Sequence, residues 1–359
     1  MKKANIYYRK DGRWEGRISK GRDKNGKRRY HAFFGRSRDE VERKIEVYQN
    51  KIPNAISNVQ LSQVITEWFQ SIQFRIKEST LANYMLKANK HILPAFGNMT
   101  ISQIMPTDIY KFIQQKHERK LSNRYISDIL IIIKSIFKFA VSRYHIYNPM
   151  DEVTMPKKQK SEVKLLTTDE QRRLEQYIVE NHNLTTLGIA LSNVTGLRIG
   201  ELCALQWKDI DLEKRILTVS KTIQRIQIKN GRCRTKLIIT APKTENSHRT
   251  IPIPKFMIAF LREFQGDADA YILSGSYKPL EPRTLQYRFV KILKNANLPS
   301  VHFHALRHMF ASNCVKLGFD IKALSEILGH SGVEITLNRY VHSSLEQKFK
   351  YMERVKMPI

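Results

Sequence analysis

The chain is 359 residues long and 42% hydrophobic, which is enough for two or three domains with separate cores. Its net charge of +29 argues for a polyanionic partner, most simply nucleic acid, although a basic ribosome-associated or membrane-surface protein would share this composition. The longest apolar run, Ile129 to Ile133, is far too short to span a bilayer, and no signal-peptide core follows the opening Met-Lys-Lys. The three cysteines have neither metal-ligand nor disulfide-framework spacing, which favours reduced thiols in a cytosolic protein.

Residues 1–51 are predicted to form a small basic domain, because they hold 17 lysines and arginines against 7 acidic residues. Asp11-Gly12 and Asn25-Gly26 are strong hairpin signals between short apolar stretches. The domain is expected to have three strands and then a helix, at 6–8, 14–18, 30–34 and 38–50. A basic sheet with aromatic side chains favours a DNA-reading domain, but such a domain can also bind nucleic acid loosely or dock on protein.

Residues 52–156 are predicted to be entirely helical, because apolar side chains recur there at helical spacing. The expected helices are 61–72, 79–91, one that follows Thr107-Asp108, and the longest over about 126–141. Phe96-Gly97-Asn98 breaks the pattern after the second helix. The longest helix is expected to end at Asn148-Pro149, because a residue before proline avoids the helical region.

A charged linker without apolar residues, 156–161, precedes the last domain, 162–359. There Thr167 and Glu170 form a capping box that opens a helix. Strands are expected at 216–219, 236–239 and 249–251, with helices before and after them. The predicted fold class is therefore multidomain: a three-stranded sheet plus helix, an all-helical domain, and a mainly helical α+β domain with a small sheet.

Two candidate functional positions precede the last group of helices. Arg198 lies in Thr-Gly-Leu-Arg-Ile-Gly-Glu, where a loop turns into a helix whose free N–H groups attract phosphate. Glu201, one turn later, could orient Arg198, and an ordinary surface ion pair is the alternative. Lys243 is expected at the edge of a hairpin turn between two strands, where it could give a proton to a leaving oxygen. The alternative for Lys243 is an ordinary solvated lysine.

A third candidate site lies on a helix expected over 303–317. His304, Arg307 and His308 fall at i, i+3 and i+4, so they share one face of that helix. Two histidines at this spacing resemble half a zinc site, but Ala305 stands where a metalloprotease helix has glutamate, and Arg307 would repel a cation. We therefore expect no metal. His308 is interpreted as a structural histidine.

The last candidates are His330, in Leu-Gly-His at the end of a helix, and Tyr340 ten residues later. A tyrosine on a helix usually belongs to the core. Here it accompanies arginines, which bind phosphate in a bidentate manner, and histidines, which transfer protons near neutral pH. Tyrosine can act as a nucleophile, so the set suits chemistry on a phosphodiester without a metal.

Together these residues resemble the tyrosine recombinase family, and within it the integrases of phages and conjugative transposons. The order and spacing of the family's catalytic pattern are present at 195–201, 242–244, 304–308, 328–330 and 340, and the Arg-Thr-Ile-Pro segment at 249–252 that follows the lysine matches the family as well. The resemblance implies the following catalytic residues: Arg198, Lys243, His304, Arg307, His330 and the nucleophile Tyr340, with Glu201 in support. It also implies an arm-type DNA-binding domain, a core-binding domain and a catalytic domain, at 1–51, 52–156 and 162–359.

The resemblance further implies a mechanism. Tyr340 would attack the scissile phosphate to form a 3′-phosphotyrosyl link, while Arg198 and Arg307 stabilise the developing charge. Lys243 would protonate the departing 5′-oxygen, His304 would assist proton transfer at Tyr340, and His330 would hydrogen-bond the phosphate. The ester conserves the energy of the broken bond, so no ATP, metal or other cofactor is expected.

The implied function is integration and excision of a mobile element by four protomers on two DNA attachment sites. Excisionase and DNA-bending proteins are the further partners implied, and the bacterial cytoplasm, at the nucleoid, is the implied location. A terminal helix over about 343–355 carries Leu345, Phe349 and Met352 at i, i+4 and i+7. It is expected to dock on the neighbouring protomer, although packing on its own domain is the alternative.

Two other functions compete with the integrase. A Xer-like resolvase or a type IB topoisomerase would use the same chemistry, but the basic N-terminal sheet favours an integrase with a second DNA-reading domain. A non-enzymatic DNA-binding protein would have no need of the complete catalytic set.

Overall fold

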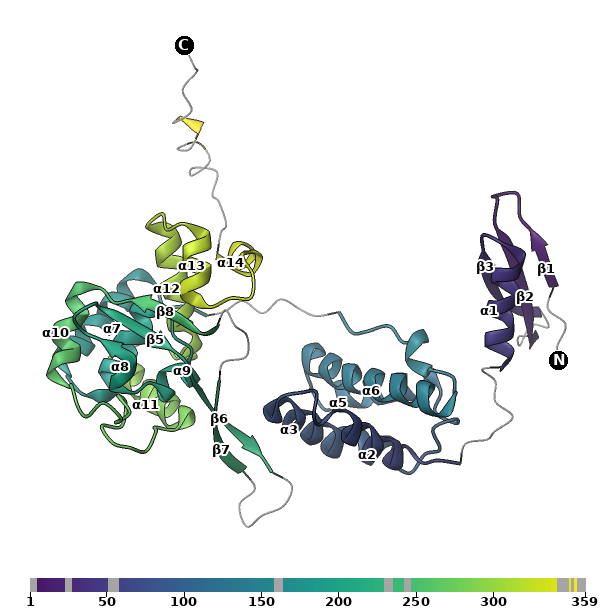
Figure 1. Cartoon of the computed structure of the whole chain (residues 1–359), viewed down its shortest axis with the longest axis horizontal. Helices are drawn as coiled ribbons and strands as arrows, with labels where there is room; N and C mark the ends of the chain where they lie inside the picture. The colour runs from purple at the N-terminus through teal and green to yellow at the C-terminus, as the bar shows by residue number, and fades with distance from the viewer. Residues whose placement is uncertain are drawn as a thin grey trace. The chain divides into compact units, whose positions relative to one another are not determined.

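The computed structural model describes residues 5–22, 28–50, 58–157, 164–228, 235–241, 247–340, 349 and 352–353. The chain divides into two compact units, Met1–Lys160 and Ser161–Ile359 (Figure 1). The predicted linker over 156–161 includes this point of division. Among the described helices, none combines the length and the apolar character that a membrane crossing requires.

The first unit begins with a three-stranded antiparallel sheet, as predicted, in the order β1(Asn5–Tyr8), β2(Trp14–Arg22), β3(Arg28–Gly35). Helix α1(Arg38–Asn50) lies along one face of this sheet (Figure 1). Val41 and Ile45 of the helix pack with Ile18 of β2 in a small buried core. Residues that alternate with these along the strands form the other face, where Tyr7 pairs with Glu15 and Glu15 pairs with Phe34.

The rest of the first unit is helical, as predicted. Its elements are α2(Leu61–Ile72), α3(Glu78–Lys87), the π-helical turn η1(Ala88–Ile92), α4(Leu93–Phe96), α5(Pro106–Glu118), α6(Asn123–Tyr144) and the 3₁₀ turn η2(Pro149–Glu152). The second predicted helix therefore continues to Phe96 through the π-helical turn. Trp68, Phe112 and Phe137 are among the largest buried side chains of this domain.

The prediction that Asn148-Pro149 ends the longest helix is wrong. Helix α6 ends at Tyr144, because His145 takes a left-handed conformation with φ of 53° and its N–H donates to the Val141 carbonyl, 3.0 Å away. Asn148 instead caps η2, where its side chain accepts a hydrogen bond from the Met150 N–H at 3.1 Å.

The second unit is mainly helical, with one large core. Its helices are α7(Thr168–Glu180), α8(Leu184–Thr195), α9(Ile199–Ala204), α10(Lys255–Glu263), α11(Pro282–Asn295), α12(His304–Lys316), α13(Ile321–Leu328) and α14(Val333–Tyr340), with a 3₁₀ turn η3(Trp207–Asp209). The predicted capping box opens α7: the Glu170 N–H donates to Thr167 Oγ1 at 3.3 Å, and the Thr167 N–H donates to the Glu170 carboxylate at 2.7 Å. Helices α12, α13 and α14 pack together (Figure 1). The predicted terminal helix lies largely outside the described residues.

The strands of the second unit form two small sheets. One has the order β4(Ile210–Asp211), β5(Ile216–Val219), β8(Arg249–Pro252), and the other pairs β6(Thr222–Gln227) with β7(Thr235–Thr240). The predicted hairpin between 236–239 and 249–251 is therefore wrong, because β7 pairs with β6, a strand that we did not predict, and β8 pairs with β5. Figure 1 shows β6 and β7 projecting from their unit as a two-stranded ribbon.

Candidate active site

Three arginines meet at the C-terminal end of α13. The Nε of Arg249 donates to the carbonyl of Ile327 at 2.6 Å, the Nη2 of Arg307 to that of Leu328 at 2.6 Å, and the Nη2 of Arg198 to that of Gly329 at 2.9 Å. The last carbonyls of a helix have no partner within the helix and carry its negative partial charge. The end of α13 therefore fixes three guanidinium groups that would otherwise repel one another.

Two glycines in left-handed conformations shape these contacts. Gly196 ends α8 with φ of 66°, and its carbonyl accepts a hydrogen bond from Arg307 Nη1 at 2.8 Å. Gly329 ends α13 with φ of 63°. Residues with a Cβ adopt this conformation at a cost, which explains glycine at both helix ends.

Glu201 connects two of the arginines. Its carboxylate accepts from Arg198 Nη1 at 2.7 Å, from Arg249 Nη2 at 2.9 Å and from Arg249 Nη1 at 3.2 Å. Burial would raise the pKa of Glu201, but hydrogen bonds and charge from Arg249, together with the charge of Arg198, lower it below its ordinary value. The carboxylate is therefore ionised and orients both guanidinium groups.

Among the predicted catalytic residues that the structure describes, Arg307 is the most deeply buried, at 2% exposure. Burial and the charge of Arg198 lower the pKa of Arg307 to about 9, while Glu201 acts in the opposite direction. A guanidinium has five N–H donors, and the hydrogen bonds to Gly196 and Leu328 use two of them. The side chain of Arg198 is 37% exposed, which leaves it accessible to an anion.

Tyr340 lies at the end of α14 among the predicted histidines. Its hydroxyl is 3.0 Å from Nδ1 of His308, and its ring is parallel to that of His330, with the ring centroids 6.4 Å apart. His330 Nδ1 is in turn 2.8 Å from Oγ1 of the buried Thr336. His304 is exposed, and its ring stands at right angles to that of His308, with centroids 4.8 Å apart. Arg307 is near enough to Tyr340 for the two to interact electrostatically.

The structure thus brings together Arg198, Glu201, His304, Arg307, His330 and Tyr340. Lys243, the remaining predicted site residue, lies outside the described residues. Two residues that we had not predicted join the site. Arg249 was part of the recognised Arg-Thr-Ile-Pro segment, but its sequence did not show that its side chain would be buried against Glu201. His308 was interpreted as structural, yet it contacts the hydroxyl of Tyr340.

The comparisons with known proteins cover both units. Residues 158–347 match the family model described as the phage integrase family, and residues 60–117 match the phage integrase N-terminal SAM-like domain. A protein of Caldanaerobacter subterraneus subsp. tengcongensis described as tyrosine recombinase XerC-like is 30% identical over an alignment 368 residues long, which covers 94% of this chain and 94% of that protein. The ICEBs1 integrase of Bacillus subtilis is 26% identical over an alignment 309 residues long, which covers 82% of this chain and 82% of that protein.

Solved structures show the same fold. The Tn1549 transposon integrase in complex with a circular intermediate DNA superposes with a TM-score of 0.69 at 24% identity, over 83% of this chain and 99% of that chain. The lambda integrase dimer bound to a COC′ core site gives a TM-score of 0.61 at 21% identity, over 98% of this chain and 97% of that chain. The match to the lambda integrase covers nearly the whole chain and therefore includes the N-terminal sheet, whereas the match to the Tn1549 integrase covers 83% of the chain.

Proposed function

The chain belongs to the phage integrase family of tyrosine recombinases, enzymes that break and rejoin DNA, and on that premise we propose that Tyr340 is its nucleophile. The observation that carries this assignment is the meeting of Tyr340 with Arg307, His308 and His330 beside the end of α13. The protein is then a site-specific integrase, and its substrate is a phosphodiester of double-stranded DNA.

The first chemical step follows from this arrangement. The Oη of Tyr340 forms a bond to the scissile phosphorus while the bond from phosphorus to the 5′-oxygen breaks. The two arginines bind the nonbridging oxygens, whose charge grows in the transition state, and fixed donors stabilise such charge without reorganisation. The fixation of Arg198 and Arg307 by helix carbonyls and by Glu201 supports this role.

Two protons move in the same step. The phenol proton of Tyr340 leaves with the help of His304, and the 5′-oxygen receives a proton from Lys243. His330 hydrogen-bonds the phosphate. In the reverse direction a 5′-hydroxyl from a partner duplex attacks the phosphotyrosyl ester and releases Tyr340, which exchanges the strands.

A nicked suicide substrate tests the assignment, because the short fragment that carries the released 5′-hydroxyl diffuses away and the covalent complex accumulates. The wild type should give a protein–DNA adduct on a denaturing gel, and Tyr340→Phe should give none. Tyr277→Phe is the matched control, because Tyr277 is an exposed tyrosine of the same unit. An adduct from Tyr340→Phe, or none from the wild type, would contradict the proposal.

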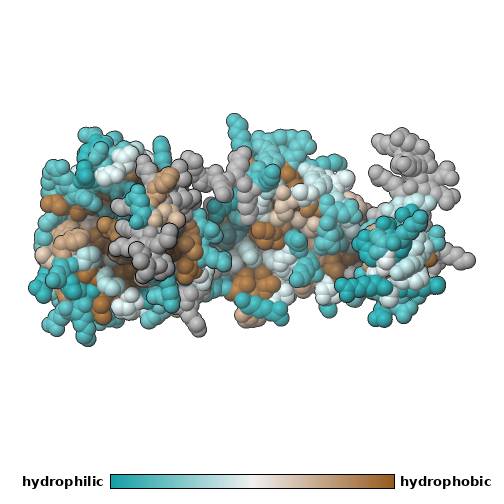
Figure 2. Space-filling model, turned by 90° about the horizontal axis from the view of Figure 1, so that it is seen from above, coloured by the Kyte–Doolittle hydropathy of each residue, from teal (hydrophilic) through white to brown (hydrophobic). Residues whose placement is uncertain are grey.

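We propose that residues 1–51 bind distal, arm-type DNA sites. On the face of the sheet away from α1, the guanidinium of Arg17 stacks on the Tyr7 ring at 5.3 Å, and those of Arg9 and Arg13 stack on the Phe34 ring at 5.6 Å. The side of this domain visible in Figure 2 is mostly hydrophilic. Stacked, exposed guanidinium groups suit a phosphate backbone.

Deletion of residues 1–51 tests this role. Cleavage of a core-site substrate should remain, while binding to separate distal sites should weaken, with a smaller dependence on salt because fewer phosphates are contacted. Equal binding of the truncated and full-length chains to both kinds of site would contradict the two-reader arrangement.

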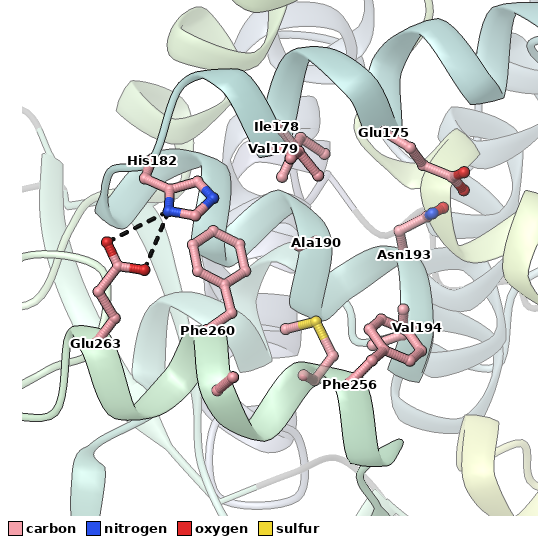
Figure 3. Close-up of a pocket in the computed structure, with 12 residues that line it drawn as sticks. Glu175, Ile178, Val179, His182, Ala190, Asn193, Val194, Phe256, Phe260 and Glu263 are labelled. Atoms are coloured by element: carbon pink, nitrogen blue, oxygen red, sulfur yellow. Dashed lines mark hydrogen bonds and ion pairs between the residues drawn. The ribbon is translucent and has the colours of Figure 1, made fainter.

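We propose that self-association on DNA uses the C-terminal segment of one protomer and an apolar pocket of its partner. The pocket has a volume of about 500 Å³ and lies among α7, α8 and α10 (Figure 3). It is lined by apolar side chains such as Val179, Phe256 and Phe260. Val179 is 70% exposed and Phe256 is 68% exposed. A surface of this kind favours burial by a partner.

The chemistry of the pocket matches that segment. Phe349 and Met352 of the segment are exposed, at 62% and 67%, and they are spaced to share one helical face. Residues 344–359 hold four basic and two acidic side chains, whereas Glu175 and Glu263 line the pocket. The side-chain oxygen of Asn193, also in the lining, is buried without a hydrogen-bond partner among the described residues and could accept one from the incoming segment.

Removal of residues 344–359 should abolish assembled complexes of two DNA sites in a native gel, while single-site binding remains. Val179→Glu should act likewise, because it places a charge on the apolar lining. Val290→Glu on α11 is the matched control, because Val290 is another exposed valine of this unit, at 47%, and does not line the pocket. Unchanged assembly in the deletion or in Val179→Glu would contradict the docking model.

We further propose that the protein works in the bacterial cytoplasm at the nucleoid, with an excisionase and DNA-bending proteins that set direction. Its charge of +29 supports a location on DNA. Excision assays with and without a purified excisionase and DNA-bending proteins test whether these partners set the direction of the reaction.

A further inference from the structure

The hydrogen bond between Tyr340 and His308 is a feature that the recombination chemistry above does not use. His308 follows Arg307 on α12 and is 4% exposed, and Tyr340 is 9% exposed. The hydroxyl of Tyr340 is 3.0 Å from Nδ1 of His308. Two buried polar groups at this distance satisfy each other, and separation would cost each of them this hydrogen bond.

We propose that His308 is a positioning residue that holds the Tyr340 hydroxyl beside the phosphate-binding arginines of its own protomer, an inference that rests on the proposed role of Tyr340 as nucleophile. In this arrangement Nδ1 accepts the hydrogen bond that the Tyr340 hydroxyl donates before the attack, and His304 assists removal of the proton during it. Arg307 and His308 are consecutive on one rigid helix. The same turn of α12 therefore fixes one phosphate ligand and the direction of the attacking oxygen.

The surroundings of Tyr340 show why a hydrogen bond is needed for this purpose. His330 lies parallel to the tyrosine ring and, with the buried side chains of Ala311, Cys314, Leu324 and Leu328, limits where the ring can lie. Ring contacts of this kind do not fix the hydroxyl. The bond to His308 does so, and a displacement of the reacting atom by about 1 Å can cost about 100-fold in rate.

The contact is made by Nδ1 of His308 and not by Nε2, and this difference can be tested by substitution. In His308→Asn the side-chain amide falls near the place of Nδ1 and can still accept from Tyr340. In His308→Gln the amide falls near the place of Nε2, one bond farther from the backbone, and misses the hydroxyl. His308→Ala removes the acceptor altogether.

Single-turnover cleavage of the nicked substrate by these full-length variants is the measurement. We expect His308→Ala and His308→Gln to cleave about 100-fold more slowly than the wild type, and His308→Asn to keep most of the rate. Binding to the core site should be the same in all four proteins, because His308 is not a proposed phosphate ligand. The pair of Asn and Gln variants decides the question even if the Ala variant fails to fold.

Equal rates for the Asn and Gln variants, or a wild-type rate for either Gln or Ala, would overturn the positioning role. A substrate with sulfur in place of the bridging 5′-oxygen adds a second readout, because its leaving group needs no proton. Rescue of His308→Gln by this substrate would place His308 at the leaving group instead, and would also overturn the proposal. Failure of the nucleophile assignment is recognised separately, by an adduct from Tyr340→Phe.

Discussion

The second unit, at the candidate active site, and the N-terminal sheet each hold a buried carboxylate between two arginines, but they do so in different surroundings. Glu201 is 4% exposed and binds Arg198 and Arg249, whereas Glu15 is 1% exposed and binds Arg9 and Arg17, both at 2.6 Å. The side chain of Arg249 is 6% exposed, while those of Arg9 and Arg17 are 36% and 44% exposed. The two clusters therefore share a composition and differ in the hydration of the guanidinium groups.

For the roles proposed above, this difference gives two ways to bind a phosphate. In the second unit Arg198 and Arg249 have second anchors at the carbonyls that end α13, so their guanidinium groups are held in place without a ligand. On the sheet the arginines face water and aromatic rings, which suits a contact that forms along a backbone and weakens with salt. The chain has three tryptophans, one in each predicted domain. Fluorine NMR of fluorotryptophan-labelled protein can therefore follow the unfolding of the two regions separately.

The largest expected effect is that of Glu201→Ala. The change leaves the buried Arg249 without its carboxylate, and the removal of one partner of a buried ion pair costs about 3–5 kcal/mol of stability. Urea denaturation followed at the Trp207 signal measures the loss. Glu15→Ala, followed at the Trp14 signal, should lose less, because its arginines can return to water. Equal losses would remove the distinction between the clusters.

The next effect is that of Gly196→Ala. A left-handed conformation costs a residue with a Cβ about 1–2 kcal/mol, and the new Cβ would lie 2.6 Å from the Phe310 ring and 2.8 Å from Leu328. Overpacking of that kind adds about 1–3 kcal/mol. Gly318→Ala is the matched control, because Gly318 has φ of 79° and open space around its Cβ position. The same loss in both variants at the Trp207 signal would show that packing near the site is loose.

Much of the geometry of the candidate site could be predicted because its signals are local. The spacing of His304 and His308 predicts adjacent rings on one helix, and the position of Arg198 before α9 predicts its proximity to Glu201, one turn later. The capping box at Thr167 is local in the same sense. Such features depend on residues three or four positions apart.

The features of the fold and of the site that could not be predicted depend on contacts between distant segments. The carbonyls at the end of α13 are part of the backbone, so no side-chain type in the sequence marks them as ligands of three arginines. Arg249 lies 48 residues from Glu201, and the pairing of β7 with β6 is one of several that alternating strands allow. Likewise, the contact of Tyr340 with His308 is set by the packing of α14 against α12.

The third prediction concerns Arg249→Lys, which keeps the charge but not the geometry. A lysine cannot bind both oxygens of Glu201 and the Ile327 carbonyl together, and each charged hydrogen bond contributes about 1.5–3 kcal/mol. We expect a loss of that size at the Trp207 signal, and slower cleavage with unchanged DNA binding. Unchanged cleavage would show that the orientation of Glu201 by Arg249 has no part in catalysis.

The smallest expected effect is on the pH dependence of stability, which should differ between the two clusters. Hydrogen bonds from Arg17 and Arg9 lower the pKa of Glu15 from 4.5 to about 2, against burial, which would raise it. Between these two pKa values the unfolded chain binds more protons at Glu15 than the folded chain does. The contribution of Glu15 to stability is therefore complete above about pH 4.5 and is lost as the pH falls through about 2. Glu15→Gln should remove this dependence at the Trp14 signal and leave the Trp207 signal unchanged. An unaltered acid profile at Trp14 would show that water, and not the carboxylate, satisfies the arginines of the sheet.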